Sequence, residues 1–104
     1  MDRYRVLVVC GSGASSAFMA IALRKAIAER GLRIEVRARS EADIENYVDE
    51  IDAVMVGPHL SVYYDTLKER YLDQVPVILM RSDYYSTMDG HKALDHLLSE
   101  TGWE

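Results

Sequence analysis

Four short, largely apolar runs recur along the chain, at residues 6–9, 34–36, 53–56 and 75–79. Runs this short and this rich in β-branched residues favour strands over buried helix segments. The first and third runs are apolar at every position, as in strands covered on both faces. The second lies in a stretch where charged residues occupy alternate positions, which is typical of a strand at the edge of a sheet.

Segments with helical spacing separate and follow these runs. In the third segment Tyr63, Leu67 and Tyr71 fall on one face, with Tyr64 left to solvent. Asp89 precedes the last segment and is suited to cap its free backbone N–H groups. The predicted helices span residues 15–30, 41–48, 61–71 and 90–101.

The repeated order of strand and helix predicts an α/β fold, in which helices cover both faces of a parallel sheet. With right-handed crossovers and the first strand in the interior, the expected order of the four strands is 2-1-3-4. We expect residues 1–104 to form one domain, because 104 residues fit a single compact domain and leave no room for two.

Composition narrows the classes of function. Lys and Arg number 12 and Asp and Glu 17, so the net charge is −5 and the pI is near 5.1. No basic stripe is present to neutralise the phosphates of a nucleic acid. No apolar stretch reaches the roughly 18 residues of a membrane span, and no leader with a cleavage site precedes the first strand, so we expect a cytoplasmic protein.

The chain has a single cysteine, Cys10, which excludes an internal disulfide and directs attention to the thiol itself. In an open parallel sheet, ligands bind beyond the carboxyl ends of the strands, where the strand order reverses. In the order 2-1-3-4 that point lies between the first and third strands. Cys10 ends the first strand, and the small residues that follow lead into the first helix: Gly11, Ser12, Gly13, Ala14, Ser15 and Ser16.

A loop of this composition can hold an anion. Its glycines allow backbone N–H groups to converge, the helix dipole adds partial positive charge, and serine hydroxyls supply further donors. The same field is expected to lower the pKa of the Cys10 thiol and to raise its thiolate fraction. The sulfur is therefore a candidate nucleophile that carries a tetrahedral oxyanion. The alternative is a buried packing cysteine beside a simple glycine turn.

Two known thiol–phosphate chemistries use a comparable loop. Small protein-tyrosine phosphatases and related arsenate reductases place an arginine six residues after the cysteine, where it clamps the phosphate. Here that position is Ser16, and the first arginine after Cys10 is Arg24. A loop without the clamp can hold a phosphoryl group on sulfur but is poorly equipped to drive its hydrolysis. The loop therefore favours a carrier of phosphoryl groups over a phosphatase.

The chain resembles enzyme IIB of the bacterial phosphoenolpyruvate:sugar phosphotransferase system (PTS), in its lactose/cellobiose (chitobiose) group. The resemblance extends over nearly the whole chain, and residues 10–13 are also similar to IIB domains of the galactitol and ascorbate groups. It rests on landmarks in the same order, namely residues 6–10 with Gly13, Ser15 and Ser16, then residues 56–60 before an amphipathic helix, then residues 75–78, and finally residues 88–94.

The resemblance implies a phosphocarrier. Cys10 would take a phosphoryl group from a phosphohistidine on a IIA protein. It would then pass the group to a sugar held by the IIC membrane permease, so the chain would act as a protein-phosphocysteine–sugar phosphotransferase. The backbone N–H groups of residues 11–16 would cradle the phosphoryl oxygens. We also expect a monomeric chain that needs no cofactor and reaches the membrane only through the permease.

Three residues beyond the loop are candidates for a supporting role. His59 follows the third strand, which neighbours the first, and can donate a hydrogen bond to an anion on Cys10. The alternative for His59 is an ordinary exposed loop histidine. Asp83 and Tyr84 follow the fourth strand at the same end of the sheet. We expect Asp83 to cap a loop or contact a partner, and Tyr84 and Tyr85 to contribute to a docking surface.

His91 and His96 lie five residues apart on the last predicted helix, which is not the i,i+4 spacing of a metal site. We expect both to be solvated surface histidines, and no residue pattern predicts a metal. Two other functions stay open. One is a low-molecular-weight thiol phosphatase or arsenate-reductase-like enzyme, and the other is a module that binds a free anion without covalent chemistry.

Overall fold

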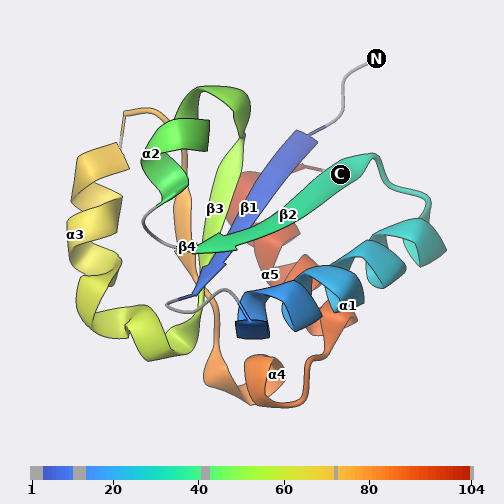
Figure 1. The fold of residues 1–104 in the computed structure, drawn as a ribbon. Helices are drawn as coiled ribbons and strands as arrows, with labels where there is room; N and C mark the ends of the chain where they lie inside the picture. The colour runs from blue at the N-terminus through green and yellow to red at the C-terminus, as the bar shows by residue number, and fades with distance from the viewer. Residues whose placement is uncertain (1–3, 11–13, 41–42, 72, 104) are drawn as a thin grey trace.

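The computed structural model describes residues 4–10, 14–40, 43–71 and 73–103. All of its strands run parallel, in the order β2-β1-β3-β4, which confirms the predicted topology (Figure 1). The central strand β1 pairs with β2 on one side and with β3 on the other. The strands are β1 (Tyr4–Cys10), β2 (Ile34–Ser40), β3 (Ala53–Val56) and β4 (Val77–Leu79).

The helices connect the strands and follow the last one. Helices α3 and α5 begin and end at the predicted residues, and α1 begins one residue earlier than predicted. The predicted start of the second helix at residues 41–42 lies outside the described residues, and a short 3-10 turn, Val48–Glu50, follows its described part. The helix α4 is not predicted by the sequence. The bounds are α1 (Ala14–Arg30), α2 (Ile44–Tyr47), α3 (Ser61–Tyr71), α4 (Ser82–Ser86) and α5 (Gly90–Thr101).

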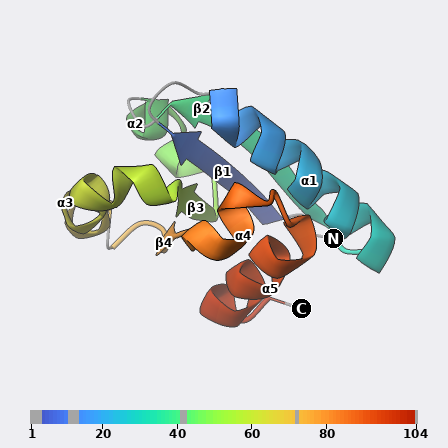
Figure 2. The same cartoon turned by 90° about the horizontal axis from the view of Figure 1, so that it is seen from below.

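Helices cover both faces of the sheet (Figure 2), and an apolar core lies on each face. Alternate residues of β1 point to opposite faces, as the period of a strand requires. Val6 and Val8 pack in the core that α1, α4 and α5 cover, whereas Leu7 and Val9 pack in the core that α2 and α3 cover. This two-sided burial explains why the first and third runs are apolar at every position.

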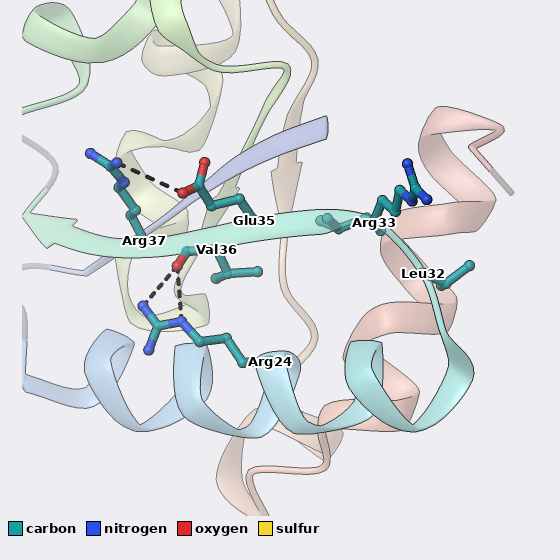
Figure 3. A pocket seen from close by; sticks show the side chains of 7 residues that line it. Arg24, Leu32, Arg33, Glu35, Val36 and Arg37 are labelled. Carbon is teal, nitrogen blue, oxygen red and sulfur yellow. Dashed lines mark hydrogen bonds and ion pairs between the residues drawn. The ribbon is translucent and has the colours of Figure 1, made fainter. Parts of the chain in front are cut away.

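Arginines occupy the outer edge of β2. The guanidinium of Arg24, on α1, donates from Nε and Nη2 to the Val36 carbonyl oxygen at 3.0 and 2.7 Å (Figure 3). Arg39 donates from Nη1 to the carbonyl oxygen of Ala38 at 2.7 Å. The carbonyls of Val36 and Ala38 are two residues apart, so both point away from β1, toward the open edge of the sheet. The arginine side chains therefore occupy acceptors to which a further strand would otherwise bind.

Helices α1 and α5 approach each other at the start of α5. A Cβ atom added to Gly90 would lie 2.1 Å from the backbone oxygen of Ala22, so this contact requires a residue without a side chain. Asp89 caps the helix as predicted, because its carboxylate accepts the backbone N–H of Lys92 at 3.1 Å. Gly102 ends the helix in the left-handed conformation, with φ at 77°.

An aromatic stack joins the two ends of the described chain. The rings of Tyr4, at the start of β1, and Trp103, just after α5, lie 4.1 Å apart between centroids and are nearly parallel, at 5°. Both residues lie at the amino-terminal side of β1, away from Cys10 at its other end. The stack therefore holds the last described residues against the first.

One predicted helix face is wrong. Tyr63 is 52% exposed, whereas Tyr64 packs against the core under α3 together with Leu67 and Tyr71. The buried residues Leu60, Leu67 and Tyr71 and the partly buried Tyr64 form a series whose steps of four and three residues also match a helical face. The predicted assignment therefore exchanged Tyr63 and Tyr64.

Candidate functional site

Cys10 is the last residue of β1, as predicted, and is fully buried. Its Cα is in register with Ser40 of β2, and β3 flanks the preceding residue Val9 on the other side. The strand order reverses between β1 and β3, so Cys10 ends its strand at the point where open parallel sheets bind ligands. Residues 11–13, which carry part of the predicted anion loop, lie outside the described residues.

Helix α1 begins at Ala14, four residues after Cys10 along the chain. It is 17 residues long and has no acidic residue in its first turn, so the partial positive charge of its amino end is not offset there. Of the predicted loop residues, the structure places the backbone of residues 14–16 in this first turn. The side chains of Ser15 and Ser16 are outside the description, and their role as donors stays a prediction.

The same edge of the sheet carries two further segments. A short 3-10 turn, Pro58–Leu60, follows β3, and α4 follows β4 (Figure 1, lower edge). The turn is joined to the cysteine strand, because the Gly57 N–H donates to the carbonyl oxygen of Val9 at 2.9 Å. The structure therefore brings His59, Asp83 and Tyr84 to the edge of the sheet at which Cys10 ends its strand.

His59 is exposed, and its ring lies over Gly57. A Cβ atom added to Gly57 would be 2.7 Å from Cε1 and 3.2 Å from Nδ1 of the imidazole. The ring of Tyr85 is also near the imidazole, at 6.0 Å between centroids. His59 thus has two defined neighbours, Gly57 just after β3 and Tyr85 on α4, beside the strand that carries Cys10.

Asp83 is exposed and lies in the first turn of α4. Its Oδ1 accepts the backbone N–H of Tyr84 at 2.7 Å, and its Oδ2 pairs with Arg81 Nη2 at 3.2 Å. The hydrogen bond from Tyr84, and then the nearby guanidinium, lower the pKa of this carboxyl. Asp83 is therefore ionised at neutral pH. The described partners of its carboxylate are two near neighbours in the sequence, Arg81 and Tyr84.

Tyr84 and Tyr85 are buried, at 3% and 7% exposure, so the predicted docking role for their side chains is wrong. Both belong to the core between the sheet, α1 and α5. The hydroxyl of Tyr84 shares a hydrogen bond of 2.6 Å with Nδ1 of His96 on α5. Burial raises the pKa of Tyr84 to about 12. Tyr84 thus fastens α4 to α5.

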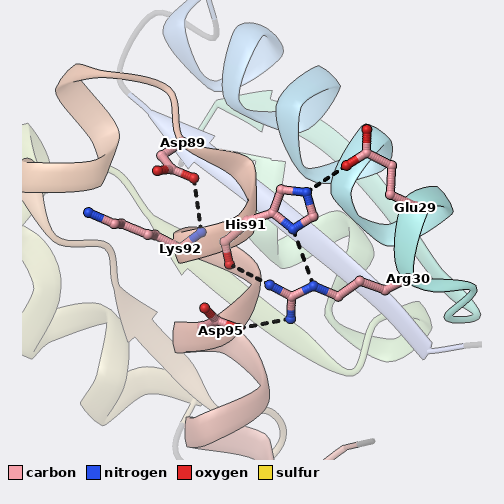
Figure 4. A network of polar contacts seen from close by, with 6 residues as sticks. All are labelled: Glu29, Arg30, Asp89, His91, Lys92 and Asp95. Atoms are coloured by element: carbon pink, nitrogen blue, oxygen red, sulfur yellow. Dashed lines mark hydrogen bonds and ion pairs between the residues drawn. The ribbon is translucent and has the colours of Figure 1, made fainter.

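The prediction of solvated surface histidines on α5 is confirmed for His91, which is exposed, and is wrong for His96. The side chain of His96 is 20% exposed and contacts Tyr84. His91 is exposed but belongs to a polar network between α1 and α5 (Figure 4). Arg30 Nε donates to its Nδ1 at 3.2 Å, and its Nε2 lies 2.6 Å from Glu29 Oε1. Both histidines therefore connect α5 to a neighbouring helix.

The Tyr84–His96 contact was not predicted, although the position of His96 in the sequence gives one indication of it. His96 lies three residues after Ala93, which is buried, and one before Leu97, which is also buried, so it falls on the inner side of α5. A histidine in that position needs a polar partner inside the core. The spacing of His96 from His91 excludes an i,i+4 metal pair but does not indicate this buried contact.

A hollow lies along the outer edge of β2, and Cys10 is not among its lining residues (Figure 3). Its volume is about 690 Å³, and it is open to solvent. Its arginines do not converge on a common point, because Arg24 binds the carbonyl of Val36 whereas Arg37 pairs with Glu35 at 3.8 Å. The hollow therefore lacks the arrangement of an anion site.

Two further features are absent from the described part of the chain. No group of three or more His, Cys, Asp or Glu residues in it is placed to hold a metal ion. Among the helices described, none combines the length and the apolar character needed to cross a bilayer.

Comparisons with known proteins agree with this geometry. The chain is 27% identical over 95 residues to the galactose-specific EIIB component of the PTS of Lactococcus lactis subsp. cremoris, covering 86% of this chain and 88% of that protein. It is 29% identical over 97 residues to the lactose-specific EIICB component of Lacticaseibacillus casei, covering 90% of this chain and 17% of that longer protein.

A solved structure shows the same fold. The lactose-specific IIB component domain of the phosphoenolpyruvate:carbohydrate phosphotransferase system from Streptococcus pneumoniae superposes with a TM-score of 0.86 at 19% identity, covering 96% of this chain and 99% of that chain. The family model described as "PTS system, Lactose/Cellobiose specific IIB subunit" matches residues 5–96. The chain therefore belongs to the lactose/cellobiose-specific IIB family of the PTS.

Proposed function

We propose that this chain is a phosphocarrier whose acceptor is the sulfur of Cys10. The observation that carries the proposal is the position of Cys10 at the end of β1, beside the reversal of strand order and just before the 17-residue helix α1. Membership in the IIB family supports the same activity. A phosphoryl group on the sulfur would lie where the sheet edge and the positive end of the helix dipole meet.

The transfer has two halves. In the first, the Cys10 thiolate attacks the phosphorus of a phosphohistidine on a IIA protein. An S–P bond forms, the N–P bond breaks, and its electron pair returns to the imidazole nitrogen, which takes up a proton. In the second, a sugar hydroxyl oxygen attacks the phosphorus, an O–P bond forms, the S–P bond breaks to restore the thiolate, and the hydroxyl proton is released. Positioning and charge stabilisation are the main demands on the protein.

The predicted loop residues supply that stabilisation in this proposal. The backbone N–H groups of residues 11–16 donate to the phosphoryl oxygens, and the first turn of α1 contributes part of this set. Each charge-assisted hydrogen bond contributes on the order of 1.5–3 kcal/mol. Asp83 and Tyr84 support the site indirectly, because they fix the start of α4 at the same edge.

Apolar side chains at this end of the molecule support docking of protein partners there. Large apolar residues lie exposed near the starts of α1 and α3, the helices that leave the carboxyl ends of β1 and β3. Exposed apolar side chains of this size are available for contact with a partner. They are Phe18 (64% exposed), Ile21 (58%), Val62 (79%) and Tyr63 (52%).

In this proposal the donor IIA protein and the IIC permease dock over the same end in turn. The L. casei relative, which joins IIC and IIB in one chain, supports a direct approach to the permease. The chain would then act in the cytoplasm, at the membrane only through that partner. The sugar would be of the kind for which the relatives are named, such as galactose or lactose.

Incubation with phosphoenolpyruvate and the upstream components, including a purified IIA protein, tests the proposal. We expect intact-mass spectrometry to show one added phosphoryl group and peptide mapping to place it on Cys10. The variant Cys10→Ser is expected to carry no phosphoryl group to sugar.

The control for folding is the thermal unfolding curve of Cys10→Ser, which should stay close to that of the parent chain. A phosphoryl group found on His59, or none on any residue, would contradict the proposal. Steady hydrolysis of p-nitrophenyl phosphate by the isolated chain would instead favour a thiol phosphatase.

A further inference from the structure

His59 is seated on Gly57 in a way that no residue with a side chain at position 57 would permit. The imidazole Cε1 lies 2.7 Å, and Nδ1 3.2 Å, from where a Cβ atom of residue 57 would be. Cβ atoms in proteins essentially never approach another heavy atom to 2.7 Å. The absence of a side chain at residue 57 therefore defines where this ring lies.

The backbone of Gly57 does not itself require glycine. Its φ of −62° and ψ of 145° are extended values open to any residue. The clash of an added methyl group would be with the movable ring of His59, whereas Val9 O, the next backbone atom, would lie at an ordinary 3.4 Å. An alanine at this position would thus displace the imidazole and leave the chain path intact.

Gly57, over which the His59 ring lies, is hydrogen-bonded to the strand that carries Cys10. The N–H of Gly57 donates to the carbonyl oxygen of Val9 at 2.9 Å, and Val9 immediately precedes Cys10. The ring of Tyr85 flanks the imidazole at 6.0 Å between centroids, with an interplanar angle of 51°. His59 is nevertheless an exposed residue, at the edge of the sheet at which Cys10 ends its strand.

We propose that His59 donates a ring N–H to an oxygen of the phosphoryl group on Cys10, and that Gly57 is the positioning residue for this imidazole. This inference rests on the proposed function of Cys10. The histidine forms no covalent bond in the transfer. It offers a neutral or charge-assisted hydrogen bond to an anion that the backbone N–H groups also hold.

A double-mutant cycle tests the pairing of the two residues. We compare the rate of Cys10 phosphorylation by a phosphorylated IIA protein in the parent chain, His59→Ala, Gly57→Ala and the double variant. Loss of one hydrogen bond to a charged group corresponds to roughly a tenfold slower transfer. Gly57→Ala should slow the parent about as much as His59→Ala does, but should change the rate of His59→Ala less than twofold.

A conservative variant and a spectroscopic readout separate this role from a merely structural one. His59→Gln keeps an N–H donor and should recover most of the lost rate. In the NMR spectrum of the parent chain, the imidazole proton resonances of His59 should shift when Cys10 is phosphorylated. Those of His91, an exposed histidine on α5, should not shift, and His91→Ala should transfer at the parental rate.

The outcomes distinguish the inference from the proposed function. If Cys10 is phosphorylated but His59→Ala keeps the parental rate, or if Gly57→Ala is equally slow with and without His59, the inference is overturned and the proposed function stands. The inference is also overturned if His59 resonances stay unchanged on phosphorylation. If the parent chain is never phosphorylated on Cys10, the proposed function fails and this inference with it.

Discussion

The buried hydroxyl of Tyr84 connects two helices inside an apolar layer. The residue lies between the sheet, α1 and α5, and its hydroxyl meets Nδ1 of His96 at 2.6 Å. A buried hydroxyl without this partner would lose its hydration and gain nothing in return. The contact therefore holds α4, which flanks the candidate site, at a fixed place on α5.

The raised pKa of Tyr84 predicts a loss of stability at high pH. The phenol titrates near 10 in an unfolded chain and at about 12 in the folded one. Between these values the unfolded state binds fewer protons than the folded state, so the free energy of unfolding falls as pH rises. At neutral pH, Tyr84→Phe should lower that free energy by about 1 kcal/mol, through loss of the hydrogen bond.

Urea unfolding at pH 8 and pH 11 checks this prediction. The free energies of unfolding of the parent chain and of Tyr84→Phe should differ by about 1 kcal/mol less at pH 11 than at pH 8, because the phenylalanine has no proton to lose. Tyr63→Phe, at an exposed position of α3, is the matched control and should show no such narrowing. A constant difference between the two pH values would contradict the assignment of the shift to Tyr84.

At the scale of elements, the helices predicted best have end signals within their own sequence. Helix α5 begins after Asp89, which caps it, and ends at Gly102, which adopts the left-handed conformation. Helix α4 has only five residues, too few to show a helical period. Burial of Tyr84 and Tyr85 stabilises it, and that burial depends on tertiary contacts with α5 and with α1, which lies far away in the sequence.

The exchange of Tyr63 and Tyr64 has a related cause. The series 63, 67, 71 and the series 60, 64, 67, 71 both follow helical spacing and share two members. Only the direction in which α3 leaves the 3-10 turn Pro58–Leu60 decides which series faces the sheet, and this direction is a tertiary property. Local pattern thus predicted the helix and could not determine its rotation.

The contact between α1 and α5 predicts a strong effect of Gly90→Ala. The added methyl group would meet the Ala22 backbone oxygen at 2.1 Å, and a backbone atom in a helix cannot move aside alone. The helices must separate, so we expect the free energy of unfolding to fall by about 3 kcal/mol. Denaturant unfolding followed by circular dichroism measures the change.

Gly31→Ala is the matched control for that experiment. Gly31 has a φ of 68°, and nothing lies within 4 Å of an added Cβ atom. The loss there should be limited to the backbone strain of a left-handed alanine, about 1 kcal/mol. Equal losses in Gly90→Ala and Gly31→Ala would contradict the packing argument.

At the scale of the whole molecule, an open sheet has two edges at which further strands could pair. The edge at β4 is short, with three residues, and Pro76 precedes it. The edge at β2 has seven residues, and there the arginines 24 and 39 bind outward carbonyls. A monomeric chain, as the sequence predicts, is consistent with edges protected in these two ways.

Arg24→Ala should weaken this protection. The carbonyl of Val36 would lose both guanidinium bonds, and we expect the free energy of unfolding to fall by about 1–2 kcal/mol. Exposure of the acceptor should also make self-association detectable by sedimentation velocity at high protein concentration. Lys25→Ala, an exposed neighbour on α1, is the control and should stay monomeric. A strictly monomeric Arg24→Ala would contradict this role of Arg24 and would show that the charged side chains of β2 alone protect the edge from pairing.

The location of the candidate site was predictable at this scale, because the carboxyl ends of parallel strands meet at one edge and Cys10 and His59 each follow a predicted strand. The position of the His59 ring over Gly57 was not predictable from the sequence. It depends on the direction of one ring relative to a backbone atom two residues earlier. Sequence reasoning therefore identified the residues of the edge, and three-dimensional contacts were needed to assign them partners.

The stack of Tyr4 and Trp103 has a practical consequence for the spectroscopist. Trp103 is the single tryptophan of the chain, and its ring lies against the first described strand residue. Its fluorescence therefore reports whether the two ends of the fold are closed on each other. Because the indole lies at the far end of β1 from Cys10, this optical signal records folding without direct interference from chemistry on the sulfur.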